Sequence, residues 1–194
     1  MLALAACEPP PPPPQPIVAV GDGDAPPVAV TAEPRATAIA SSAPSAELGS
    51  AVGQEAPPLR GARVIGDGPH DVGEARGRVT IIHFWATFCA PCRTSLREFQ
   101  SLADRYKNRV AIIAVSVDDA QDVMVTDVRD FAVQAGARYS IVWDQDRETA
   151  DRYQPPRLPT TYVIDRYGIV RHIHPGHTSE DAASIGEEVT RLLK

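Results

Sequence analysis

The chain has 194 residues, of which 43% are hydrophobic and 23% are charged. It is therefore long enough to bury the core of one domain and to carry an additional segment. The net charge of -6 is spread along the chain, and there is no basic patch with interleaved aromatic residues. Nucleic-acid binding therefore has no support in the sequence.

The chain opens with MLALAACEPP, in which an aliphatic residue and two small residues precede Cys7. This order resembles a bacterial lipoprotein signal, whose cysteine receives lipid after cleavage. A secretory signal also has a positive segment and a longer apolar run, which residues 1–7 lack. We predict a truncated signal at 1–7 with Cys7 as the lipidation site. The alternative is a disordered N-terminus with a chance cysteine.

A proline-rich region follows. Of the 19 prolines, 13 precede residue 59, in a stretch that is also rich in alanine, serine and glycine and almost free of aromatic residues. Such a composition cannot bury enough apolar surface to offset the conformational entropy lost on folding. Residues 8–52 are therefore predicted to be a disordered tether with local polyproline-II character.

Residues 53–194 are predicted to form one α/β domain. The apolar runs VTIIHFW at 79–85 and VAIIAVSV at 110–117 are typical of strands buried on both faces. Helical periodicity predicts helices at 90–106 and 122–135, and Gly136 ends the second of them.

The second half of the domain predicts a mixed sheet. The turn signal Asp165–Gly168 indicates a β-hairpin, and Ser179 is the predicted cap of the last helix. The predicted elements are a short strand at 139–143, a helical turn at 147–153, hairpin strands at 160–164 and 169–174, and a closing helix at 180–193. Strand-helix-strand units followed by a hairpin and a helix indicate a small α/β sandwich.

Two of the three cysteines, Cys89 and Cys92, form a Cys-x-x-Cys motif. Cys89 follows the buried strand at 79–85 by a few residues, and Pro91 suits the first turn of a helix. Cys89 thus lies at a helix N-terminus, where the positive end of the helix dipole favours the thiolate. Cys92 is close enough to bond to it. The motif therefore predicts a redox pair with one activated and one shielded sulfur.

A metal site and a purely structural disulfide are the alternatives. A zinc site needs four ligands, and no second Cys-x-x-Cys or His-x-x-x-His completes the set. A disulfide across two intervening residues removes little chain entropy. We therefore predict no metal and no cofactor beyond the disulfide itself. The histidines are scattered at His70, His83, His172, His174 and His177.

The segment FWATFCAPCR at 84–93, followed by LPTTYVID at 158–165, resembles the thioredoxin superfamily. Within it, residues 53–194 are similar to the membrane-tethered TlpA/ResA-like (redoxin, AhpC-TSA type) thiol-disulfide oxidoreductases of the bacterial cell envelope. VGQEAPPL at 52–59 resembles the entry segment of that family, and the helix at 122–135 resembles its insertion. The resemblance implies a thioredoxin-like three-layer sandwich with a mixed central sheet.

The resemblance also implies roles for individual residues. Cys89 is the expected nucleophile, Cys92 the resolving thiol, and Pro159 the cis-proline beside the sulfurs. The alternative for Pro159 is an ordinary trans proline at the start of a strand. Trp85 and Phe88 are expected to wall the site, and the backbone of Leu158 to pair with an extended substrate. The predicted substrate-binding or supporting residues are Trp85, Phe88, Ala90, Pro91, Leu158 and Thr160.

The chain departs from the family at several positions. Ser95 and Arg97 stand where relatives often carry a glutamate and a helix-kinking proline. His83 occupies the strand position where relatives place a buried Asp or Asn. His83 is a candidate proton relay for Cys92; the alternative is a buried histidine whose hydrogen bonds are satisfied within the core.

The expected function is thiol-disulfide exchange with protein substrates, in the reducing direction. By analogy, the substrates are cytochrome or copper-site cysteines, as in cytochrome c biogenesis, and a membrane protein supplies electrons. The protein is expected to be a lipid-anchored, periplasm-facing monomer. One alternative is a thiol peroxidase, although Ala86 replaces the threonine of its usual Thr-x-x-Cys context. Another is copper delivery by Cys89 and Cys92 with His174 or His177.

Overall fold

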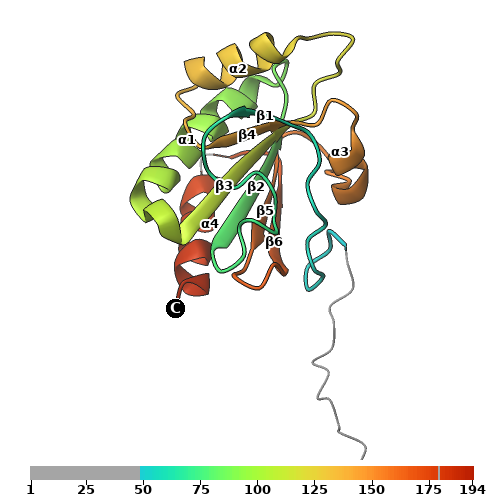
Figure 1. The fold of residues 1–194 in the computed structure, drawn as a ribbon. Coiled ribbons are helices and arrows are strands. Elements are labelled where there is room, and N and C mark those ends of the chain that lie inside the picture. Colours follow the sequence, from blue (N-terminus) through green and yellow to red (C-terminus); the bar gives the residue numbers. More distant parts are fainter. Residues whose placement is uncertain (1–48, 179) are drawn as a thin grey trace, which may run out of the picture. The chain divides into compact units, whose positions relative to one another are not determined.

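The computed structural model describes residues 49–178 and 180–194 (Figure 1). The predicted signal with Cys7, the tether up to residue 48 and the predicted cap Ser179 lie outside the described residues, so these remain predictions. Among the described residues, no helix is both long enough and apolar enough to span a membrane.

The domain is a six-stranded sheet with helices on its faces (Figure 1). The strands are β1 (Ala62–Ile65), β2 (Val79–Trp85), β3 (Val110–Ser116), β4 (Ser140–Trp143), β5 (Thr160–Ile164) and β6 (Val170–Pro175). The helices are α1 (Ala90–Tyr106), α2 (Val125–Gln134), α3 (Glu148–Tyr153) and α4 (Asp181–Leu192), with a short 3-10 turn at Lys107–Arg109. The strand order is β1-β4-β3-β2-β5-β6.

The sheet is mixed, as predicted. β2, β3 and β4 run parallel, while β1, β5 and β6 pair antiparallel with their neighbours. β1 was not among the predicted strands. It has four residues, of which the first two are exposed and the last two half-buried, so it has no continuous apolar run that would mark it in the sequence.

Helices cover both faces of the sheet. Consecutive residues of a strand point to opposite faces. On β2, the His83 ring meets Phe99 of α1 with centroids 4.6 Å apart, whereas Phe84 meets Tyr153 of α3 at 5.3 Å. α1 and α3 therefore lie on opposite faces (Figure 1). α4 joins α1, because Ile185 packs in the same buried cluster as Phe99.

Helix α2 begins later than predicted and ends as predicted. Its first residue is Val125 rather than Asp122, because the Asp127 carboxylate accepts the backbone N–H of Met124 at 2.8 Å and caps the helix there. At the other end Gly136 has φ +86°, and it donates its N–H to the Val133 carbonyl at 2.9 Å. This left-handed glycine is the predicted stop.

The hairpin of β5 and β6 brings the C-terminal strands beside β2. Its turn contains Gly168 at φ +83°, and the Asp165 carboxylate accepts the N–H groups of Tyr167 and Ile169. The predicted turn at Asp165–Gly168 is thus confirmed. β5 pairs antiparallel with β2, which places the start of β5 at the end of β2.

Candidate active site

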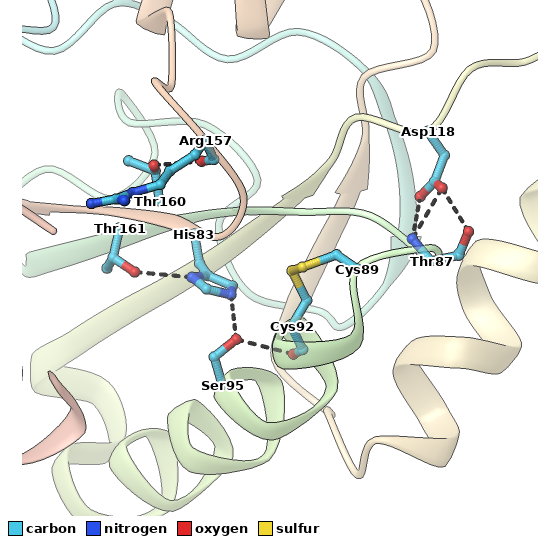
Figure 2. The surroundings of a disulfide bond; sticks show 9 residues. All are labelled: His83, Thr87, Cys89, Cys92, Ser95, Asp118, Arg157, Thr160 and Thr161. Atoms are coloured by element: carbon cyan, nitrogen blue, oxygen red, sulfur yellow. Dashed lines mark hydrogen bonds between the residues drawn. A yellow bond between two sulfur atoms is a disulfide. The ribbon is translucent and has the colours of Figure 1, made fainter. Parts of the chain in front are cut away.

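Cys89 and Cys92 are joined by a disulfide at the N-terminus of α1 (Figure 2). Cys89 is the N-cap residue and Cys92 lies in the first turn, with their Cα atoms 5.3 Å apart. Cys92 is fully buried, while Cys89 keeps 7% of its surface exposed. The two cysteines therefore differ in burial, as the predicted redox pair requires, and Cys89 is the outer one.

The first turn of α1 favours an anionic sulfur at Cys89. The exposed residues Ala90 and Pro91 open the helix, and the proline stands where no intrahelical N–H partner is needed. The described part of the chain supplies no side-chain cap for this helix end. A Cys89 thiolate formed on reduction therefore lies at the positive end of the helix dipole without a competing acceptor.

A buried aspartate anchors the loop that leads from β2 into the motif. Both carboxylate oxygens of Asp118 accept the backbone N–H of Thr87 at 3.0 Å, and one accepts the Thr87 hydroxyl at 2.6 Å (Figure 2). Asp118 is 1% exposed and also accepts the Ser116 hydroxyl. No sequence motif marks Asp118. The only signal was a carboxylate directly after a buried strand.

Both ring nitrogens of His83 are hydrogen-bonded, and Ser95 links the ring to the backbone of Cys92 (Figure 2). Its Nε2 is 2.8 Å from Ser95 Oγ, and its Nδ1 is 3.0 Å from Thr161 Oγ1. Ser95 donates its single hydroxyl proton to the Cys92 carbonyl at 3.0 Å. Ser95 must therefore accept from Nε2–H, which leaves Nδ1 to accept from Thr161.

The His83 ring is neutral at ordinary pH. Burial in the core, together with the nearby charge of His177, lowers the pKa of His83 to about 3. No hydrogen bond joins its ring to either sulfur among the residues that the structure describes. This arrangement favours the alternative interpretation, in which His83 is a buried histidine whose hydrogen bonds are made within the core. Its link to Cys92 runs only through Ser95.

The Leu158–Pro159 peptide bond is cis. Pro159 directly precedes Thr160, which pairs with Phe84 of β2, so the turn lies beside the strand end from which the Cys89 loop departs. The Pro159 carbonyl accepts the N–H of Gly176 at 2.7 Å. Within the described chain, the backbone N–H and C=O of Leu158 have no hydrogen-bond partner. Both groups are thus available to an extended peptide.

Of the two aromatic residues predicted to wall the site, only Phe88 reaches the surface. Phe88 is 77% exposed and, with Leu158, lines a cavity of about 480 Å³. Trp85 is instead fully buried, and its indole stacks on Phe131 of α2 with ring centroids 5.3 Å apart. The guanidinium of Arg93 covers Phe131 at 4.1 Å. Trp85 is therefore a core residue that links the end of β2 to α2.

The late histidines do not gather around the cysteines. His174 contacts Glu188 of α4 at 2.8 Å, and His177 contacts Glu98 of α1 at 3.2 Å. Among residues 49–178 and 180–194, no group of three or more histidine, cysteine, aspartate or glutamate side chains is arranged to hold a metal ion. The copper-delivery alternative thus has no ligand set in the described structure.

Comparison with known proteins identifies the family. The model of the AhpC/TSA family matches residues 52–173. The chain belongs to the AhpC/TSA family. The thioredoxin-like protein YneN of Bacillus subtilis is 32% identical over 130 residues, which cover 67% of this chain and 75% of YneN. The thiol-disulfide oxidoreductase ResA of Geobacillus kaustophilus is 31% identical over 151 residues, or 77% of this chain and 76% of ResA.

A solved structure supports the same assignment. The crystal structure of a protein provisionally named thiol:disulfide interchange protein DsbE, from Chlorobium tepidum, superposes with a TM-score of 0.65 at 25% identity. It covers 74% of this chain and 99% of that protein. The thioredoxin-like fold is therefore confirmed for this AhpC/TSA chain. The family and the Cys89–Cys92 disulfide together confirm the predicted enzyme class, a thiol-disulfide oxidoreductase.

Proposed function

We propose that this protein is a cell-envelope thiol-disulfide oxidoreductase that reduces disulfides in protein substrates. The observation that carries the proposal is the Cys89–Cys92 disulfide at a helix N-terminus, beside a cis peptide whose Leu158 backbone is free to pair. A membrane-bound dithiol donor returns the pair to its reduced form, and the domain acts as a monomer. A thiol peroxidase usually has a threonine three residues before its reactive cysteine, and this chain has Ala86 there, which gives no support to a peroxidase.

The reaction proceeds by two exchanges at sulfur. The Cys89 thiolate attacks one sulfur of the substrate disulfide, whose S–S bond breaks and releases a substrate thiolate that takes up a proton. Cys92 then loses its proton and attacks Cys89 Sγ in the mixed disulfide, which releases the second substrate thiol. Two electrons pass from the protein to the substrate, and the protein is left with the disulfide seen in the structure.

The surroundings of the pair fit a protein substrate. The Leu158 backbone offers one donor and one acceptor to an extended segment, which is the pairing used in strand addition. The cavity beside Phe88 and Leu158 provides room for a neighbouring substrate side chain. Cys92 is fully buried, which favours Cys89 as the sulfur that meets the substrate first.

The exchange is tested with the full chain carrying Cys7→Ser, so that Cys89 and Cys92 are its only thiols. The reduced protein is mixed with an equal amount of a peptide that contains one disulfide, and thiols are counted by mass. We expect the protein to lose two thiols and the peptide to gain two. A protein that stays reduced while the peptide stays oxidised would refute the proposed activity.

The location rests on a separate proposal, that Cys7 carries lipid and residues 8–52 span the distance from the membrane to the domain. In cells that export the protein, we expect the chain to incorporate labelled palmitate and to sediment with membranes. Cys7→Ser should lose both the label and the membrane association, while Cys89→Ser should keep both. A wild-type chain without label would refute the anchor and leave the exchange proposal intact.

A further inference from the structure

The loop between β6 and α4 contacts both halves of the active site. Gly176 has φ +91° and donates its N–H to the Pro159 carbonyl at 2.7 Å. The next residue, His177, places Nε2 3.2 Å from Oε2 of Glu98 on α1. Two consecutive residues of one loop thus link the cis-proline turn to the helix that carries the cysteines.

The contact of His177 with Glu98 is partly shielded from solvent. The side chains are 11% and 32% exposed, respectively. Glu98 Oε2 is itself buried and makes no aligned hydrogen bond to any residue the structure describes, and the His177 ring lies 3.2 Å from it. A buried carboxylate oxygen needs such a partner. Glu98 follows Cys92 by six residues, or about 9 Å along the helix.

The cis-proline turn is packed closely against the same loop. A Cβ atom added to Gly176 would lie 3.3 Å from Nε of Arg157, so the Arg157 side chain rests on the glycine. The Thr160 hydroxyl closes the turn from the other side by donating to the Arg157 carbonyl at 2.7 Å (Figure 2). A shift of the loop would therefore move the turn with it.

We propose that His177 and Glu98 are positioning residues that hold the Leu158–Pro159 turn at the correct distance from the Cys89 sulfur for peptide substrates. This inference rests on the proposed function. Neither side chain touches the reacting atoms. Their effect follows from geometry, because an extended peptide must meet the Leu158 backbone and the Cys89 sulfur together, and small misplacements of paired groups are costly. A small disulfide has to contact only the Cys89 sulfur, so its reaction does not depend on the position of the turn.

The test compares two oxidised substrates, a disulfide-bonded peptide and a small aromatic disulfide. In the Cys7→Ser full chain, His177→Ala should lower the rate constant for the peptide by about tenfold, chiefly through a higher KM. It should leave the rate with the small disulfide unchanged. His177→Gln should recover part of the loss, because its carboxamide N–H can still reach Glu98. Glu98→Gln should act in the same direction as His177→Ala but less strongly, because its carboxamide oxygen can still accept from His177.

His172→Ala is the matched control. His172 lies on β6 and, like His177, contacts a glutamate, in this case Glu188 at 3.3 Å, but within the described chain it makes no hydrogen bond to the cis-proline turn. It should leave both rates unchanged. An equal loss on both substrates in His177→Ala and Glu98→Gln, or no loss on the peptide, would overturn the inference. A wild-type protein inactive on both substrates would instead refute the proposed function, so the two failures are distinguishable.

Discussion

Cys92→Ser will trap the protein on its substrate as a mixed disulfide through Cys89, and Cys89→Ser will lower the exchange rate on the order of 10³-fold or more. The reason is chemical. Attack needs a thiolate, and Cys89 lies at the helix N-terminus and keeps 7% of its surface exposed, whereas Cys92 is fully buried. Without Cys92, the mixed disulfide has no neighbouring thiol to resolve it.

Both variants are measured in the Cys7→Ser background by intact mass after mixing with a disulfide-bonded peptide. Cys7→Ser alone is the control, and it should exchange fully without a lasting adduct. The Cys92→Ser protein should gain the mass of one peptide, and reductant should remove it. An adduct on Cys92 in the Cys89→Ser protein, with none in the Cys92→Ser protein, would show that the two roles are reversed.

Acid will destabilise the oxidised protein through His83. In the folded state the pKa of this histidine is lowered to about 3, while in the unfolded chain it is about 6.5. Below pH 6.5 the unfolded state therefore binds a proton that the folded state excludes. The free energy of unfolding should fall by up to about 1.4 kcal/mol per pH unit until pH 3. Between pH 7 and pH 4.5, His83 should lower the free energy of unfolding by roughly 2–3 kcal/mol.

The matched variant is His83→Gln, whose amide can donate to Ser95 and accept from Thr161 but does not titrate. Urea unfolding of both disulfide-bonded proteins at pH 7 and pH 4.5 gives the decrease in the free energy of unfolding for each protein. Carboxylates contribute to acid unfolding in both proteins and cancel in the difference. The variant should start less stable at pH 7 and lose less stability on acidification. Equal losses would mean that His83 is not held neutral by the fold.

The central strands and the hairpin were predictable because local signals mark them. β2 and β3 are continuous apolar runs, and Gly136 and Gly168 stop or turn the chain where a left-handed backbone is needed. β1 was not predictable, since its four residues are partly exposed and it exists by pairing with β4. The start of α2 depended on a single carboxylate cap at Asp127.

In the candidate site, the residues that a contiguous motif carries were predictable, and those that folding brings together were not. Cys89, Cys92 and Pro159 follow from local sequence. Asp118 holds Thr87 across 31 residues, and His177 reaches Glu98 only through the hairpin. The burial of Trp85 likewise depends on Phe131 of α2, a packing contact that periodicity on one strand does not reveal.

The reduction potential of the Cys89–Cys92 pair tests the account most directly. The full chain with Cys7→Ser is equilibrated in glutathione or dithiothreitol buffers, and its free thiols are counted by mass. We predict one two-electron transition with a potential well below about -220 mV, on the reducing side of the glutaredoxins. A value near about -120 mV would contradict the reducing direction and indicate an oxidant. Failure to form the disulfide in any buffer would contradict the redox assignment itself.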